Sequence, residues 1–587
     1  MKKGRQRSAL AALLAFGLFL AACSSGEPTE TTEAAGDSTT TEATTETTAA
    51  PTTETTEAPT AEGGIITTYI TEPEFLQPPQ TNESEGNAVL TALFRGLIDY
   101  DPETSEPAFT GVAESITSPD EGLTWEVVLK DGWTFHDGTP VTAQSFVDSW
   151  NYSAYGPNAA QVSGFFAPIA GYADLQCGTV TQPNEETGED EDVADCENQP
   201  PAAEEMSGLS VTDDLNFTIT LSAPETFFMT KLGYTAYYPL PEAFFADPAA
   251  YNEAPIGNGP FMMDGSWEHD IEIRTVANPD FAGEDKPQIE GLTFKLYADV
   301  DAAINDLMAG NLDIVDSVTP ERFAEVQAAV PNSDQSPQSS TTYLAFPFYL
   351  PQFENPDVRA ALSMAIDRQA LVDSPIFNGL RQPAFNIQAP VIPGYQETVC
   401  DHWNYDPEQA AALWESSGGI TEPMTVWFNA GAGHDAWVEA VVNMWAETLG
   451  IDPTTVSFEQ LEFADYLPRL DEQGMTGPFR LGWGMDYPHP QNFWQQLLDS
   501  RFQPPVGSNT SFYSNPEFDA KIDEANAQAD INDAIPLYQE AAAIACEDTP
   551  MAPIYFLENL YAWSDNVDGV YVDAFGNVVY TALTAGG

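Results

Sequence analysis

The chain has 587 residues, of which 91 are acidic and only 18 are basic, so its formal net charge at pH 7 is −73. This balance excludes nucleic acid as a natural partner, because such binding depends on Lys and Arg side chains that neutralise phosphates. Apolar residues make up 43% of the chain and aromatic residues 11%, which is enough for two or three domains of roughly 100 to 200 residues each.

The first 22 residues have the pattern of a secretory signal peptide. Four Lys and Arg residues precede an apolar run that ends at Ala22, and this run is shorter than the roughly 20 apolar residues that a spanning helix needs. The run ends in LAAC, Leu20 to Cys23, which resembles the lipobox of bacterial lipoproteins. That resemblance implies that Cys23 is lipidated and anchors the mature chain. The alternative is an ordinary secretion signal with an incidental cysteine.

Residues 23–62 predict a disordered tether. After Cys23 the segment is almost wholly Thr, Glu, Ala, Pro, Ser and Gly, without any aromatic residue, so it cannot bury enough apolar surface to offset the entropy of ordering. We expect it to hold a folded body away from the membrane surface, with its carboxylates keeping it extended by mutual repulsion. The folded body is therefore expected to be extracytoplasmic.

Four cysteines follow the tether, and an even number in an oxidising compartment favours disulfides. Four cysteines allow three pairings. A bond between Cys177 and Cys196 would pin the acidic segment between them and leave Cys400 to pair with Cys546. Free buried thiols are the alternative.

The folded part begins with an apolar, β-rich run at 65–70, and the apolar spacing at 87–97 predicts a helix. The segment 124–150 predicts a β-hairpin that leads into a helix. Apolar side chains alternate from Trp125 to Leu129, a turn is expected at 131–132, and a second strand is expected at 133–135. Thr142 is then expected to cap the helix.

Residues 355–372 predict one amphipathic helix. Asn355 is suited to cap it and Pro356 to occupy its first position. The apolar residues from Val358 to Ile366 fall on one stripe, which is typical of a helix packed on a core.

The stretch FRLGWGMD, residues 479–486, predicts a strand with two different faces. One face would be apolar core, and the other would carry Arg480, Gly482, Gly484 and Asp486. The two glycines leave room for another backbone to lie close. A cation and a carboxylate at opposite ends of such a surface suit an extended zwitterionic peptide, whose α-amino group would pair with Asp486 and whose carboxylate would pair with Arg480. The alternatives are that Asp486 only caps the following turn and that Arg480 forms a structural ion pair.

Five motifs occur in the order found in a known family: GLTWEVVLKDGWTFHDGTPVTAQSFVDSW, residues 254–314, NPDVRAALSMAIDRQALV, YDPEQAAALWESSG and GWGMDYPHPQNF. With them the chain resembles the family-5 extracellular solute-binding proteins of ABC importers, the oligopeptide- and dipeptide-binding group, over nearly all of residues 65–575. The resemblance implies an α/β, two-lobed periplasmic-binding-protein-like fold (type II, cluster C) with an extra subdomain in the first lobe. Lobe I would comprise 63–94, 241–338 and 549–587, the extra subdomain 95–240, and lobe II 339–548.

The same resemblance implies a set of ligand-binding residues. The amine-binding aspartate of the family falls on Asp486, and the arginine that some members direct at the ligand carboxylate falls on Arg480; dipeptide-binding members lack it, so ligand length stays open. The other residues included in the predicted site are Gly482, Trp483, Gly484, Tyr487, Phe463, Asn82 and Glu83. Core packing is the alternative for Phe463.

The function that follows is capture without chemistry, so we expect no enzyme, no cofactor and no metal. The expected partners are a peptide, a membrane permease with its ATPase, and the membrane through the lipid anchor, with the protein itself a monomer. A metal site joining His489 to Asp486 is a weaker alternative. The rival functions are the same fold binding a sugar, nickel chelate or opine, and a surface-tethered hydrolase with paired carboxylates.

Overall fold

The computed structural model describes residues 64–183, 190–430, 433–461, 463–504 and 507–586. The predicted signal peptide, Cys23 and the tether to residue 62 lie outside the described residues, so those expectations stay predictions. None of the helices in the described ranges is long and apolar enough to cross a membrane.

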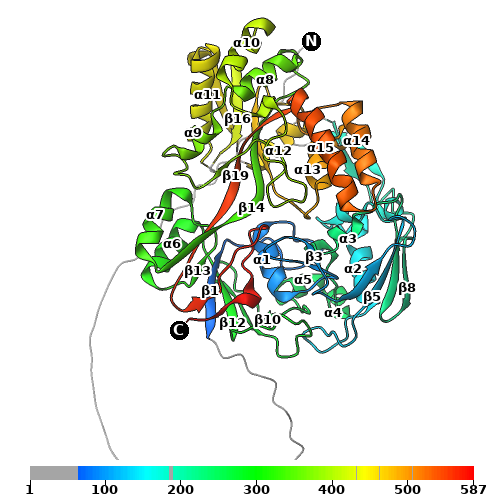
Figure 1. Cartoon of the computed structure of the whole chain (residues 1–587). Helices are drawn as coiled ribbons and strands as arrows, with labels where there is room; N and C mark the ends of the chain where they lie inside the picture. Colours follow the sequence, from blue (N-terminus) through cyan, green and yellow to red (C-terminus); the bar gives the residue numbers. More distant parts are fainter. Residues whose placement is uncertain (1–63, 184–189, 431–432, 462, 505–506, 587) are drawn as a thin grey trace, which may run out of the picture. The chain divides into compact units, whose positions relative to one another are not determined.

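One mixed sheet of eleven strands forms the centre of the described structure (Figure 1). Its order is β10 (Phe261–Met263), β11 (Glu272–Ala277), β12 (Gly291–Leu296), β1 (Ile65–Ile70), β13 (Ile314–Val315), β19 (Met551–Trp563), β14 (Asn332–Ala345), β18 (Phe479–Trp483), β16 (Met424–Asn429) and β17 (Val456–Leu461), with β15 (Gln382–Pro383) paired to β19. Strand β1 runs parallel to β12 and β13, and β16 runs parallel to β17 and β18.

The two longest strands, β14 and β19, pair antiparallel through the middle of this sheet (Figure 1). Residues 332–337 of β14 pair with 558–563 of β19, and residues 341–345 pair with 551–556. The register shifts between Pro337 and Thr341, and such a bulge bends a strand and increases its local twist. The predicted boundary between lobes I and II, at 338/339, falls in this irregular segment.

A separate four-stranded antiparallel sheet follows the order β4 (Ala113–Thr117), β5 (Thr124–Leu129), β9 (Asn216–Thr220) and β8 (Leu209–Asp213). Trp125 and Leu129 of β5 are buried as expected. The predicted hairpin is wrong, because residues 133–135 form no regular strand and contribute only an isolated bridge from Thr134 to Pro140. Helix α2 (Ala143–Ala154) begins after its cap Thr142 as predicted.

Helices cover the sheets at several places along the chain. The longer ones are α1 (Ser84–Leu93), α6 (Val300–Ala309), α7 (Pro320–Ala329), α8 (Pro356–Met364), α10 (Pro407–Ser417), α11 (Asp435–Leu449), α12 (Phe463–Asp471), α13 (Gln491–Leu498), α14 (Pro516–Asn526) and α15 (Ile531–Asp548). Asn355 caps α8 as predicted. The single helix expected at 355–372 is wrong, because Asp367 caps a second helix, α9 (Arg368–Asp373).

The remaining elements are short. They are β2 (Asp99–Tyr100), β3 (Pro107–Ala108), β6 (Thr179–Pro183), β7 (Asp190–Ala194), β20 (Val567–Asp568), β21 (Thr584–Ala585), α3 (Phe228–Lys231), α4 (Glu242–Ala246) and α5 (Pro248–Asn252).

Apolar side chains gather into several cores rather than one. One core takes nearly all its residues from 97–237, a second joins 66–94 and 238–294 to 561–583, and two more take theirs from 343–555. The predicted division into two lobes and a subdomain is compatible with this grouping, although its boundaries stay predictions.

Two disulfides cross-link the described chain. Cys177 bonds to Cys196 and Cys400 to Cys546. Of the three possible pairings, this is the one described from the sequence. The first bond flanks the antiparallel pair β6 and β7. The second ties the segment before α10 to α15, where Cys546 is fully buried.

The two disulfides should differ in their contribution to stability. They join residues 19 and 146 positions apart, and the loop-entropy model gives about 3 kcal/mol for the shorter loop and about 5 kcal/mol for the longer one. We therefore expect the Cys400→Ala/Cys546→Ala variant to have a lower urea denaturation midpoint than the matched Cys177→Ala/Cys196→Ala variant. The opposite order would contradict this account.

Candidate functional site

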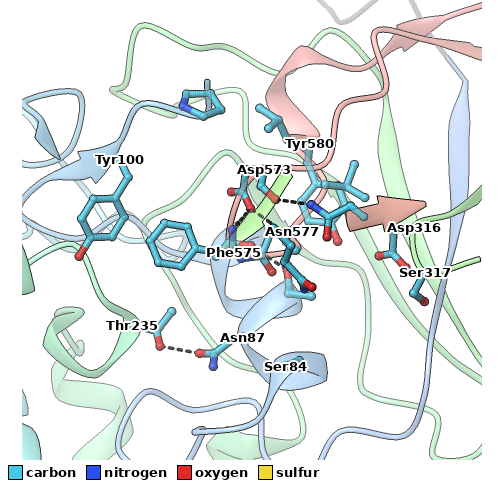
Figure 2. A pocket seen from close by; sticks show the side chains of 18 of the residues that line it. Ser84, Asn87, Tyr100, Thr235, Asp316, Ser317, Asp573, Phe575, Asn577 and Tyr580 are labelled. Atoms are coloured by element: carbon cyan, nitrogen blue, oxygen red, sulfur yellow. Dashed lines mark hydrogen bonds between the residues drawn. The ribbon is translucent and has the colours of Figure 1, made fainter. Parts of the chain in front are cut away.

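Two cavities lie beside the large sheet and share one lining residue. The larger has a volume of about 820 Å³ and the smaller about 190 Å³, and Leu557 of β19 lines both. Figure 2 shows side chains that line the larger cavity; they come from α1, β2, the segment after β13, and the C-terminal residues 573–580.

Residues 480–484, from β18 and the position just after it, line the smaller cavity. The predicted core face of this segment is therefore wrong in part, because Leu481 and Trp483 line the cavity as well. Strand β18 pairs with β14 over its whole length, but with β16 only where Phe479 meets Trp427. Beyond Phe479, its second edge has no strand partner within the described ranges. Such an edge can accept the backbone of an extended ligand.

The two glycines leave room in the smaller cavity. A Cβ atom at Gly482 would lie 3.2 Å from the Thr341 carbonyl oxygen and 3.3 Å from Arg480 Nη2, and one at Gly484 would lie 2.8 Å from Ser340 Oγ. Side chains at these positions would therefore crowd the residues that line the smaller cavity.

Arg480 is a half-buried cation without a carboxylate partner among the described residues. Its Nη1 donates to Asn429 Oδ1 at 3.0 Å, while its buried Nε has no hydrogen-bond partner in the part of the chain that the structure describes. Burial lowers the pKa of Arg480 from its ordinary value. The structural ion pair considered as an alternative is therefore absent from the described residues, and a guanidinium in this state is suited to a ligand carboxylate.

Asp486 lines the larger cavity but does not lie on a strand. Strand β18 ends at Trp483, so the predicted strand to residue 486 is too long. Asn492 of α13 holds the loop instead: its Nδ2 donates to Asp486 Oδ2 at 2.8 Å, and the Asp486 amide donates to Asn492 Oδ1 at 3.0 Å.

The carboxylate of Asp486 forms no ion pair with a described residue, and the nearby Lys231 is paired with Glu225. Burial raises its pKa, whereas the hydrogen bond from Asn492 and the charge of Lys231 act to lower it. No backbone amide of the following turn donates to this carboxylate among the described residues, so the geometry does not favour a turn-capping role. A ligand ammonium would supply the missing charge.

The other predicted residues divide into two groups. Phe463 lines the smaller cavity and Asn82 the larger. The core alternative for Phe463 is wrong, because its side chain is 48% exposed. Glu83 and Tyr487 line neither cavity.

Glu83 and Tyr487 have structural contacts that explain this. The carboxylate of Glu83 caps α1 by accepting from the Gly86 amide. Tyr487 is 3% exposed, its hydroxyl donates to Gln491, and Lys231 Nζ lies 5.2 Å from its ring. Their ligand roles stay untested predictions that these contacts do not favour.

His489 packs as a neutral ring. It stacks on Phe227 with a centroid distance of 4.4 Å and contacts Tyr538 edge-on, and burial lowers its pKa to about 3. Within the described ranges, no group of three His, Cys, Asp or Glu side chains could hold a metal ion.

The larger cavity also contains acidic residues that the sequence did not single out. Glu85, Asp316 and Asp573 line it together with Tyr69 and Tyr580. Burial raises the pKa of Asp316 and of Asp573 to about 6. Asp316 directly follows the buried strand β13, and a polar residue at a strand end was the one signal that could have indicated it.

Arg480 and Asp486 form no ion pair with a described residue and line two cavities near the end of β18. This arrangement is that of a binding site and is suited to a dipolar solute. Residues 109–504 match the model of the bacterial extracellular solute-binding proteins, family 5. The chain belongs to this family, whose members are binding proteins, and it is accordingly extracytoplasmic.

Individual relatives are distant but similar over most of their length. The oligopeptide-binding protein OppA of Bacillus subtilis is 24% identical over 528 residues, covering 87% of this chain and 90% of the relative. Heme-binding protein A of Haemophilus influenzae is 25% identical over 531 residues, covering 85% and 88%. The structure of the Escherichia coli murein tripeptide-binding protein MppA superposes with a TM-score of 0.70 at 23% identity, covering 89% of this chain and 99% of that one. The fold class is thus that of the two-lobed periplasmic binding proteins, as predicted.

The raised pKa of Asp316 makes a prediction for the ligand-free protein. Between the ordinary pKa of 3.8 and the folded value of about 6, the folded chain keeps a proton that the unfolded chain loses, so this residue makes folding less favourable as pH rises. Asn cannot ionise. We expect the melting temperature of Asp316→Asn to rise relative to wild type between pH 4 and pH 7. Glu325→Gln, which changes an exposed acid on α7, is the control; curves for Asp316→Asn and wild type that stay parallel would contradict the prediction.

Proposed function

We propose that this protein is the substrate-binding component of an ABC importer, that it captures peptides between its two lobes, and that it delivers them unaltered to a membrane permease and ATPase. The observation that carries the proposal is the position of Arg480 on β18, in the smaller cavity, and of Asp486 in the loop three residues after β18, in the larger cavity. A peptide is an extended backbone with a cation at one end and an anion at the other.

In the proposed binding mode, the two charged ends of the peptide pair with two different residues. The ligand α-amino group pairs with Asp486 in the larger cavity, and the carboxylate pairs with Arg480 in the smaller one. The ligand backbone lies along the free edge of β18, where Gly482 and Gly484 leave space. Recognition of main-chain groups in this way tolerates many side chains.

The similar proteins are named for different solutes, and the acidic lining of the larger cavity supports a choice between them. OppA of Bacillus subtilis is named for oligopeptide binding, while heme-binding protein A is named for heme. Heme carries two carboxylates, and the larger cavity here already contains Asp316, Asp486 and Asp573. Like charges at close range are unfavourable, so the acidic lining favours an amine-bearing ligand.

Closure of the lobes around the ligand is the proposed mechanism, as in hinge-bending binding proteins. The bulge between Pro337 and Thr341 is the proposed hinge, because β14 and β19 change register there. The ligand favours the closed form by its higher affinity for that form. Anchoring through lipidated Cys23, a monomeric state, and the lack of any catalysed reaction belong to the same proposal.

The role of Asp486 can be tested with alanine peptides of two to five residues. A charged hydrogen bond contributes about 1.5 to 3 kcal/mol, so Asp486→Asn should raise the Kd of the best-binding peptide by about 10- to 100-fold. The N-acetylated peptide should bind wild type and variant with equal, weak affinity. Isothermal calorimetry measures both.

Glu459→Gln is the matched control, because Glu459 is an exposed acid on β17 that lines neither cavity; it should leave the Kd unchanged. An equal loss for free and acetylated peptide in Asp486→Asn would show that the residue does not bind the amine. Failure of every peptide to bind wild type would overturn peptide capture itself.

The role of Arg480 has a parallel test at the other end of the ligand. Arg480→Met keeps an unbranched, flexible side chain but removes its charge and its hydrogen-bond donors, so it should raise the Kd of the free peptide by about 10- to 100-fold. The peptide with a C-terminal amide should bind both proteins with the same affinity. If the free peptide and the C-terminally amidated peptide lose affinity equally in Arg480→Met, then Arg480 supports the structure of the site and does not bind the ligand carboxylate.

A further inference from the structure

We propose that the larger cavity selects ligands with a cationic side chain on the amino-terminal residue, and that Glu85 and Asp316 recognise that side chain. We call Glu85, Asp316, Tyr69 and Tyr580 the acidic subsite. The inference rests on the proposed peptide function and extends it from main-chain capture to side-chain selection.

The acids of the larger cavity differ in whether they have a cation. Asp285 and Asp99 pair with Arg95, at 2.9 and 3.7 Å, so both of these carboxylates have a cation beside them. Glu558 accepts a hydrogen bond from Gln382, and the charge of the nearby Arg381 acts to lower its pKa. Among the described residues, no Lys, Arg or His forms an ion pair with Glu85 or Asp316.

The members of the acidic subsite act on one another although they come from distant parts of the chain. Glu85 lies in the first turn of α1 and Asp316 follows β13. The charge of Glu85 contributes to the raised pKa of Asp316, and both carboxylates add to the effect of burial that raises the pKa of Tyr69 to about 12. The two carboxylates therefore lie within electrostatic range of each other in the same cavity.

Tyr580 supplies an independent sign of a missing ligand group. It lines the cavity (Figure 2), it is 4% exposed, and its hydroxyl has no hydrogen-bond partner in the described chain. Burial, followed by the charges of Asp316 and Asp573, raises its pKa. Buried hydroxyls are normally paired. An ammonium or guanidinium group would donate to such oxygens and is also attracted to aromatic rings.

The large number of acidic residues in the chain does not explain why Glu85 and Asp316 line a cavity without an ion pair to any described residue. A chain with 91 acids places most of them in water, where they need no partner. Burying a carboxylate without a cation is unfavourable, and groups in this state are concentrated in functional sites. A cationic ligand removes the penalty.

The position of the acidic subsite decides which ligand residue it meets. Asp486 lines the same cavity as Glu85 and Asp316, whereas Arg480 lines the smaller cavity. A peptide whose amine pairs with Asp486 therefore directs its first side chain into the larger cavity. A volume of about 820 Å³ accommodates a Lys or Arg side chain with its bound water.

The test uses alanine peptides of the length that binds best, with Lys, Ala or Glu as the first residue. Calorimetry on wild type should give a Kd for the Lys peptide about tenfold lower than for the Ala peptide, and the weakest binding for the Glu peptide. In the Glu85→Gln/Asp316→Asn variant, the ratio of the Ala to the Lys Kd should fall to near one. Each single variant is measured as well, and circular dichroism verifies that each protein is folded.

Glu325→Gln is the matched control and should keep the wild-type ratio, because Glu325 is exposed on α7 and lines neither cavity. If all three peptides bind wild type equally, side-chain selection is wrong while peptide capture stands. If a preference for Lys persists in the folded double variant, Glu85 and Asp316 are not its source. If no peptide binds at all, the proposed function fails and this inference fails with it.

Discussion

The antiparallel pairing of β14 with β19 is the constraint on which the rest of the site depends. Strand β14 carries β18 on its other edge, with Thr342 opposite Gly482 and Leu344 opposite Arg480. A slip of one residue would turn Arg480 and the glycines to the opposite face of the sheet. The bulge between Pro337 and Thr341 brings Ser340 and Leu557 to the wall of the smaller cavity. The geometry of the ligand edge is thus set by strand register.

Two of the few basic side chains in this protein are buried and bond to the main chain. The buried guanidinium groups of Arg359 and Arg368 donate mainly to main-chain carbonyls, such as those of Thr549 and Ser363, although the chain has a large excess of carboxylates. These two cations are fixed in the core and are unavailable for the acids of the larger cavity. Neither Asp316 nor Asp486 forms an ion pair with a cation of the described chain, although Lys231 acts on Asp486 from a distance. Scarcity of basic residues therefore has a local consequence, since it leaves the larger cavity dependent on a cation from outside.

The sequence predicted what depends on local signals and missed what depends on distant neighbours. The caps Thr142 and Asn355 were recognisable because an N-cap acts within its own turn. Strand β18 was predicted too long. Beyond Trp483 the backbone no longer pairs with a strand, and the Asp486 amide donates to the side chain of Asn492 in α13 instead. The approach of Glu85 to Asp316 could not be predicted, because only the folded chain brings α1 and the end of β13 to the same cavity. Arg480 and Asp486 were identified by motif, although their approach to two separate cavities was not.

Strand β19 lies in the middle of the large sheet, between β13 and β14, yet it occupies residues 551–563 of a chain of 587. Its long partner β14 lies about 200 residues earlier in the chain. The central ladder of the sheet therefore forms only when two distant segments meet. Closing such a long loop costs entropy before any strand pairing is gained, so this ladder is expected to form later than the local turns and helices around it.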